Sequence, residues 1–210
     1  MKKIFCSFFL LSAALSFGQV EKISKIEILP ESSISIYGDA KVTAFTCLFD
    51  IDHLEISESI LMRKRDSQYL FKNADLTLEN RGFDCGRKGR NEDFHKMVRT
   101  KRYPEMRLTL KKAVLKADNT ANAIVEIQIA GTKQTYKVPV EISGNEIRRY
   151  RGRLKLNIRK FGLKPIKKMF GLIRVQDIIE IRFDLKIKYR HETAALENRS
   201  SGREILFSGI

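Results

Sequence analysis

The chain has 210 residues, with 40 lysines and arginines against 25 aspartates and glutamates, which gives a formal net charge of +15. Its four prolines and twelve glycines are too few for a fibrous or disordered chain, so one globular domain with a sizeable core is expected. So basic a chain would suggest a nucleic-acid partner in the cytoplasm, but the export signal described next argues against nucleic acid. Anionic lipid head groups, acidic envelope polymers or simple solubility remain as reasons for the charge.

Residues 1–18 have the form of a secretory signal peptide. Two lysines precede an apolar run over 4–15, and Ser16-Phe17-Gly18 supplies the small residues that a signal peptidase recognises. The apolar run is shorter than the roughly 20 residues of a membrane-spanning helix. We therefore expect cleavage before Gln19 and a periplasmic or secreted mature protein.

Short strand candidates come first in the mature chain, and a helix follows them. Apolar residues alternate over parts of 24–29, 33–37, 41–49 and 76–78. Beyond these, Asn91 is a plausible N-cap for a short amphipathic helix that ends before Pro104. Its apolar side chains recur at i, i+3 and i+4, namely Phe94, Met97 and Val98.

The rest of the chain has the period-two pattern of a β-meander. Even-numbered apolar residues over 106–110 and odd-numbered ones over 125–129 mark two strands, and alternation over 136–142, 153–159 and 179–189 marks three more. The segment 161–171 is expected to form a loop or a single helical turn. Residues 191–210 form a polar tail in which 205–207 could add an edge strand.

A sheet with one charged face and one apolar face must cover the apolar face. Because only one short helix is available, the simplest solution is an antiparallel sheet of about eight strands curled into a barrel over residues 19–190. The fold class is therefore all-β, with one short helix. A two-sheet sandwich satisfies the same alternation and stays open as an alternative.

Two cysteines remain after removal of the signal, Cys47 and Cys85. In an oxidising compartment we expect them to form a disulfide, and two buried free thiols are the alternative. The three histidines have no second ligand at metal-binding spacing, and the sequence has no phosphate loop or nucleophile elbow. We therefore expect neither an enzyme nor a metal site.

Five short motifs, in this order and spacing, resemble the YceI-like family over roughly 23–189. They are Ser33-Ile34-Ser35-Ile36-Tyr37-Gly38, Val42-Thr43-Ala44-Phe45-Thr46-Cys47, Phe94-His95-Lys96-Met97 ahead of Tyr103-Pro104, Phe161-Gly162-Leu163-Lys164-Pro165, and Gly171-Leu172-Ile173-Arg174-Val175-Gln176-Asp177. The resemblance implies a lipocalin-like barrel in the bacterial periplasm that encloses a polyisoprenoid chain, as in quinones.

The resemblance favours a hollow barrel, although a generic eight-stranded barrel can equally be filled by its own side chains. We therefore expect a carrier or store for an isoprenoid or other amphiphilic lipid, with no other cofactor. The apolar residues expected to line the lumen are Leu108, Leu110, Val125, Ile127, Ile129, Leu154, Leu156, Ile158, Ile181, Phe183, Leu185 and Ile187.

Two other functions stay open. A filled barrel could serve as a structural or interaction module whose basic surface binds acidic envelope components, and an enzyme using the barrel as a substrate pocket is the least supported. The basic residues over 148–168 could contact an anionic membrane surface or a ligand's head group, or they could simply be a solvated face.

Overall fold

The structure is a computed structural model that describes residues 21–40, 44–56, 59–116, 119–165, 167–168 and 173–190. The expected signal peptide and the polar tail lie outside these residues, as do parts of the 41–49 and 161–171 segments. Within the described residues, no helix is long and apolar enough to cross a bilayer.

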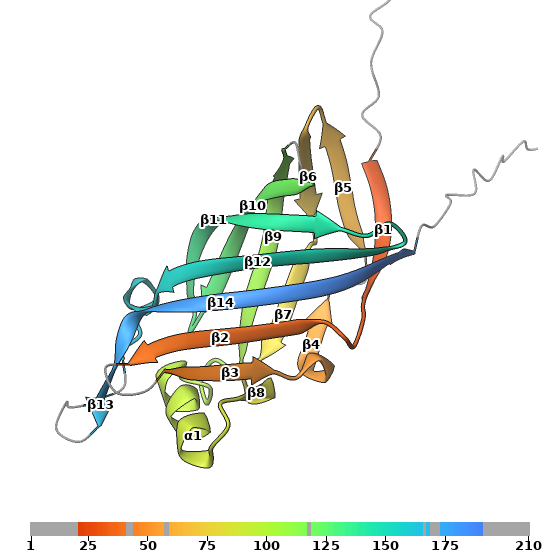
Figure 1. Cartoon of the computed structure of the whole chain (residues 1–210). Helices are drawn as coiled ribbons and strands as arrows, with labels where there is room; N and C mark the ends of the chain where they lie inside the picture. Colours follow the sequence, from red (N-terminus) through yellow and green to blue (C-terminus); the bar gives the residue numbers. More distant parts are fainter. Residues whose placement is uncertain are drawn as a thin grey trace, which may run out of the picture.

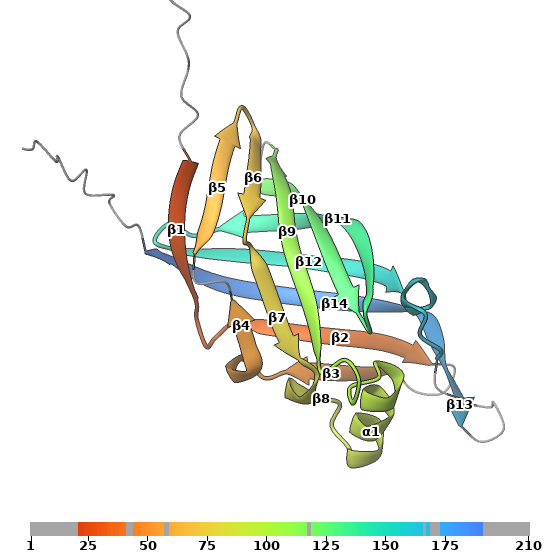
Figure 2. The ribbon, with the colours of Figure 1, turned by 180° about the vertical axis from the view of Figure 1, so that it is seen from behind.

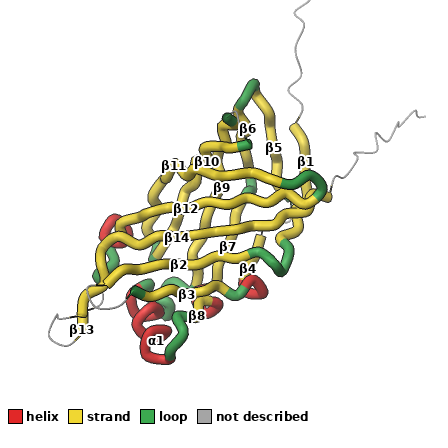
Figure 3. The backbone as a smooth tube through the Cα atoms, in the orientation of Figure 1, coloured by secondary structure: helices red, strands yellow, loops and turns green. Residues whose placement is uncertain are grey.

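One antiparallel sheet of fourteen strands dominates the fold, with a single α-helix among the described residues (Figures 1 and 3). The strands are β1 Glu21–Ile28, β2 Ser33–Ala40, β3 Phe45–Phe49, β4 Leu54–Ile56, β5 Ile60–Arg65, β6 Gln68–Lys72, β7 Asp75–Glu79, β8 Phe83–Asp84, β9 Glu105–Leu115, β10 Thr120–Ile129, β11 Thr132–Ser143, β12 Ile147–Asn157, β13 Lys167–Lys168 and β14 Ile173–Arg190. The helices are α1 Lys88–Met97 and the short 3-10 turns η1 Ile51–His53, η2 Asn80–Gly82 and η3 Ile158–Phe161.

Eight of these strands pair in a closed ring. The order is β1, β5, β6, β9, β10, β11, β12 and β14, and β14 pairs back with β1. This ring confirms the all-β antiparallel barrel of about eight strands and removes the sandwich alternative. Fourteen strands are counted because several of them bend and are interrupted.

The barrel has two different ends (Figure 2). At the first, called here the helix end, β2, β3 and β8 continue the wall from β14, and α1 and η3 lie against it. At the second, called the turn end, lie the β5–β6, β9–β10 and β11–β12 turns, the start of β1 and the end of β14. A bend between β1 and β2 turns the chain from β1, which starts at the turn end, into β2, which belongs to the helix end. The buried Ser32 fixes this bend, because its hydroxyl accepts a hydrogen bond from Lys186 N at 2.9 Å.

The alternation seen in the sequence sorts side chains between the two faces of the wall. Leu154 lies opposite Ile181 in the β12–β14 ladder and both are buried, whereas Arg153 and Arg182 point outward and are exposed. Gly152 lies opposite Phe183, whose ring occupies the space that a Cβ at position 152 would need. The inner face is therefore the hydrophobic core.

Three local expectations need correction. The helix begins at Lys88 and not after Asn91, because the Asn91 side chain holds the segment after β8: its Oδ1 accepts from Cys85 N at 2.6 Å. Phe94, Met97 and Val98 are buried as expected. Ile158 continues the alternation of β12 but lies in η3, where the chain turns. The strands β4, β5 and β6 were not expected at all.

Candidate functional site

A cavity of about 510 Å³ opens through the barrel wall between β1 and the η1–β4 segment. Its lining is mainly apolar, with two charged residues of β1, and consists of Lys25, Ile26, Glu27, Ile28, Ile51, Leu54 and Ile56. Cavities that bind small molecules typically measure about 300–1,000 Å³ and have a mostly apolar lining. The size and chemistry of this cavity match those of a ligand pocket.

The opening arises where two strands of the wall bend away from each other. In the described ladders β1 pairs with β5 only over 21–24, and β4 pairs with β7. The remaining half of β1, residues 25–28, pairs with β14 on its other side. The described ladders do not join β1 to β4, and the space between these two strands forms the cavity mouth.

The apolar lining residues of β1 and β4 face the barrel interior. Directly opposite residues of an antiparallel pair share a face. Ile28 lies opposite the buried Ile187, and Leu54 lies opposite the buried Leu78. The apolar side of the cavity therefore faces the barrel interior, and Lys25 and Glu27, on the outer face of β1, lie at its rim.

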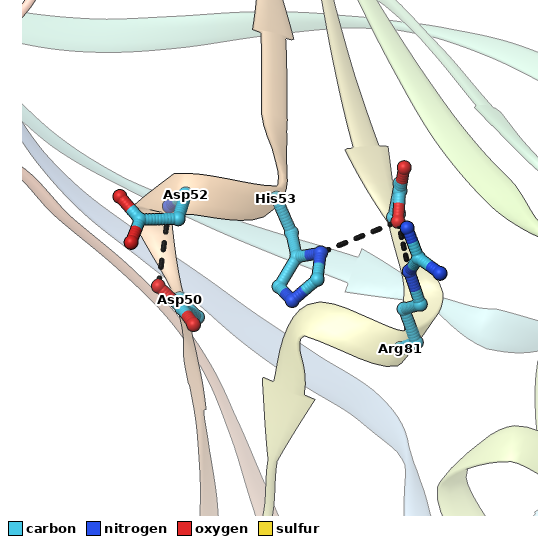
Figure 4. A network of polar contacts seen from close by, with 5 residues as sticks. Asp50, Asp52, His53 and Arg81 are labelled. Carbon is cyan, nitrogen blue, oxygen red and sulfur yellow. Dashed lines mark hydrogen bonds and ion pairs between the residues drawn. The ribbon is translucent and has the colours of Figure 1, made fainter.

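A polar network fixes η1 at the edge of the cavity (Figure 4). His53 Nδ1 lies 3.3 Å from Glu79 Oε2, and Arg81 donates to the same oxygen. The hydrogen bond from Arg81 is the main reason that the pKa of Glu79 lies below its ordinary value of 4.5, against the opposing effect of burial. Asp52 N also donates to Asp50 Oδ1 at 3.1 Å. The network holds the backbone that carries Ile51 and Leu54, and it positions no nucleophile.

Two tyrosine hydroxyls lie on the inner wall, one of them on the strand that pairs with β1. The Tyr150 and Tyr189 oxygens lie 2.6 Å apart, and Tyr189 is opposite Ile26 in the β1–β14 ladder. Burial, reinforced by Tyr150, raises the pKa of Tyr189 well above its ordinary value, so this phenol stays neutral. It can form hydrogen bonds but cannot serve as a base.

A third phenol lies deeper, toward the helix end. The Tyr136 ring stacks on Phe161 with ring centroids 6.4 Å apart, and its hydroxyl is buried without a protein hydrogen-bond partner among the described residues. Burial also raises the pKa of Tyr136. It too remains a neutral, polar group inside the barrel.

The structure places all twelve expected lumen residues in the core or against it. Eight are buried: Ile127, Ile129, Leu154, Leu156, Ile158, Ile181, Leu185 and Ile187. Four are partly buried and pack against them: Leu108, Leu110, Val125 and Phe183. Three of the twelve, Ile129, Ile158 and Ile181, line a space of only about 20 Å³ under α1. The helix end is therefore filled, and contact of these twelve residues with a ligand stays a prediction.

The residues that line the larger cavity were not assigned to a site from the sequence. Ile26 and Ile28 alternate within the expected 24–29 strand, which was the only available signal. Ile51 and Leu54 lie on and just after a 3-10 turn, where no period-two pattern exists. The hollow part of the lumen thus lies where the pattern was weakest.

Cys47 and Cys85 are both buried and are joined by a disulfide. The register that pairs Leu48 with Asp84 brings the two cysteines side by side at the helix end. Among the described residues there is no cluster of three or more His, Cys, Asp and Glu side chains that could hold a metal ion.

No protein-family model and no curated protein matches the sequence. Solved structures do match. Burkholderia cenocepacia BcnA is 18% identical, with 77% of this chain and 99% of that chain covered and a TM-score of 0.62. A polyisoprenoid binding domain from Saccharophagus degradans, implicated in plant cell wall breakdown, is 11% identical, with coverages of 81% and 100% and a TM-score of 0.54. A mutant YceI protein of Campylobacter jejuni is 16% identical, with coverages of 70% and 85% and a TM-score of 0.52.

Proposed function

We propose that this chain, which has the YceI-like fold, is a lipid-binding protein of that family and holds an isoprenoid or another amphiphilic lipid in the cavity between β1 and β4. The observation that carries the proposal is the 510 Å³ cavity with its five apolar lining residues. The Saccharophagus degradans protein of similar fold is a polyisoprenoid binding domain, which supports this class of ligand. A carrier or store in the periplasm is the corresponding role.

Binding energetics favour a long apolar chain over a short one. Each buried CH₂ contributes about 0.8 kcal/mol, whereas association costs on the order of 4–15 kcal/mol. A five-carbon isoprene unit alone would contribute roughly 4 kcal/mol, so several units must be buried before binding is useful. The chain of such a ligand would occupy the apolar interior, with its polar head at the mouth beside Lys25 and Glu27.

The geometry supports binding. Burial raises the pKa of the Tyr189 and Tyr136 phenols, and the carboxylate of Glu79 is bound to Arg81. A filled barrel acting as an interaction module is favoured only at the helix end, where the space under α1 is about 20 Å³. The filled-barrel alternative leaves the cavity between β1 and β4 unexplained.

The test is to block the cavity and measure the bound lipid. Leu54→Trp places a large ring in the cavity, and Leu48→Trp, at a position that is 62% exposed on the outer wall, is the matched control. Each purified protein is extracted with organic solvent, and the lipid per protein molecule is measured by mass spectrometry. We expect lipid in the wild type and in Leu48→Trp, and a loss of at least about tenfold in Leu54→Trp.

Circular dichroism and thermal unfolding show whether both variants are folded. A folded Leu54→Trp protein that keeps its lipid would overturn the proposed site. Wild-type protein that carries no lipid, and takes up no added long-chain isoprenoid alcohol, would overturn the function itself.

A further inference from the structure

The turn end of the barrel exposes apolar side chains beside basic ones. Leu115, at the end of β9, is 38% exposed and precedes the exposed Lys116. Ile147, at the start of β12, is 45% exposed and precedes the exposed Arg148. Single exposed hydrophobic residues need no explanation, but these two lie on neighbouring turns of the same end.

The β5–β6 hairpin extends this pattern beyond the rest of the barrel (Figures 1 and 2). The ladder from β1 through β5 to β6 puts Ile60, Met62, Tyr69 and Phe71 on the inner face and Leu61 and Leu70 on the outer face. None of the six is fully buried. The hairpin therefore carries apolar side chains on both faces, with Arg63 and Lys72 beside them on the outer face and Lys64 on the inner one. On β12 and β14 the apolar side chains lie on the inner face and the charged ones on the outer face.

Basic residues surround these apolar side chains. Residues 60–72 contain four lysines and arginines and one aspartate, and Lys64 and Arg65 at the tip are exposed. A second copy of the chain would bring two basic surfaces together, which like-charge repulsion disfavours. Apolar side chains flanked by lysine and arginine instead suit the interface of an anionic bilayer, where the chains enter the head-group region and the cations bind lipid phosphates.

We propose that the turn end, comprising the β5–β6 hairpin and the turns at Leu115–Lys116 and Ile147–Arg148, docks on an anionic lipid bilayer. The inner face of the hairpin then joins the membrane to the cavity, because Ile60 lies opposite Ser24, two residues before Ile26 on the same face of β1. Docking would thus place an apolar path between the bilayer and the lumen. The apolar path rests on the lipid site of the proposed function, whereas the docking surface itself consists of other residues.

Co-sedimentation with vesicles tests the docking surface. Wild-type protein is mixed with vesicles of phosphatidylcholine alone or with 3 in 10 lipids replaced by phosphatidylglycerol. Lys64→Glu/Arg65→Glu reverses two charges at the turn end, and Lys96→Glu/Lys101→Glu makes the same change in net charge at exposed positions of the helix end. We expect binding only to the anionic vesicles, weakened at least about tenfold by the first pair and less than about twofold by the second.

A second pair separates insertion of apolar groups from charge alone. Ile147→Ser should weaken binding to the anionic vesicles without changing how steeply that binding falls with salt, whereas Leu48→Ser, on the outer wall, should leave the binding unchanged. Absence of binding by the wild type, or equal loss in both charge-reversal pairs, would overturn the docking surface. So would a dimer in sedimentation velocity that Ile147→Ser abolishes. Solvent extraction of the same variants measures bound lipid separately, so a failure of docking and a failure of the lipid site remain distinguishable.

Discussion

The helix end and the β1–β4 wall are built from the same kind of alternating strand, yet one is solid and the other hollow. At the helix end Phe161 is fully buried, and α1 adds Phe94 and Met97 to the core. At the β1–β4 wall the apolar residues are half-buried around a 510 Å³ cavity. Alternation determines which side chains face inward. Whether these side chains fill the interior depends on the other elements that pack against them.

Two structural causes explain the difference. The helix end has additional elements, α1 and η3, whose side chains fill the barrel interior there. At the β1–β4 wall the described part of the chain contributes no such element, and the chain bends before β2 and before β4. The tightly packed core and the proposed lipid site therefore lie in different parts of one barrel, and substitutions can separate their effects.

The largest effect on stability is expected from the disulfide at the helix end. It closes a separation of 38 residues, for which the chain-entropy model gives roughly 4 kcal/mol. We expect Cys47→Ser/Cys85→Ser to lower the free energy of unfolding by about 2–5 kcal/mol in denaturant titrations, with cavity lipid largely retained. Thiol titration of the unfolded, unreduced wild type should find no free thiol at either position; two reactive thiols there would contradict the bond.

The same leucine-to-alanine change should cost very different amounts in the two regions. Leu156 is 1% exposed in the filled end, and Leu156→Ala is expected to lower the free energy of unfolding by about 2–5 kcal/mol. Leu54 lines the cavity and is half-buried, so Leu54→Ala should cost less than about 1.5 kcal/mol. Urea unfolding of both variants provides the measurement. Equal losses would show that the cavity side is packed as tightly as the helix end.

The parts that the sequence predicted are those buried on one face only. Ile179 to Tyr189 alternates without interruption, and it forms most of β14. The face of α1 was predicted from Phe94 and Met97, although its start was not, because the amide of Asn91 binds outside the helix. An element that is buried on one face only has regularly spaced apolar residues, and this spacing predicts the element from the sequence.

The parts that the sequence did not predict have no such period. Ile60-Leu61-Met62 and Tyr69-Leu70-Phe71 are consecutive apolar residues, so no alternation distinguishes the two faces of the β5–β6 hairpin, both of which are partly exposed. Ile158 kept the alternation while the backbone turned into η3. The cavity lies between β1 and β4, which are far from adjacent in the sequence, so it depends on how distant segments are placed together and on no single segment.

A smaller effect should come from the inner-wall tyrosines. Tyr150→Phe removes the hydrogen bond to the Tyr189 hydroxyl, at an expected cost of about 1 kcal/mol. Tyr136→Phe removes a buried hydroxyl that has no protein partner among the described residues, so it should be neutral or slightly stabilising. We expect thermal unfolding to give a lower melting temperature for Tyr150→Phe and an equal or slightly higher one for Tyr136→Phe. A clear loss of stability in Tyr136→Phe would instead show that its hydroxyl is bonded.

The smallest effect is expected from acid, through Glu79 beside the cavity. The pKa of Glu79 is lowered below 4.5, mainly by Arg81, so the folded protein takes up this proton at a lower pH than the unfolded chain does. The network therefore stabilises the fold above about pH 4.5, and its contribution is lost as the pH falls through the lower, folded-state value.

Glu79→Gln should remove this part of the acid dependence. Because the group is near solvent, we expect the acid-unfolding midpoint to move by only a few tenths of a pH unit, whereas Glu146→Gln in the exposed β11–β12 turn should leave it in place. Lipid retention near pH 4 is the more sensitive measurement, since η1 carries Ile51 and precedes Leu54 at the cavity edge. If Glu79→Gln held lipid at neutral pH as tightly as the wild type and lost none sooner on acidification, η1 would be held by packing alone, and the network in Figure 4 would have no role in shaping the site.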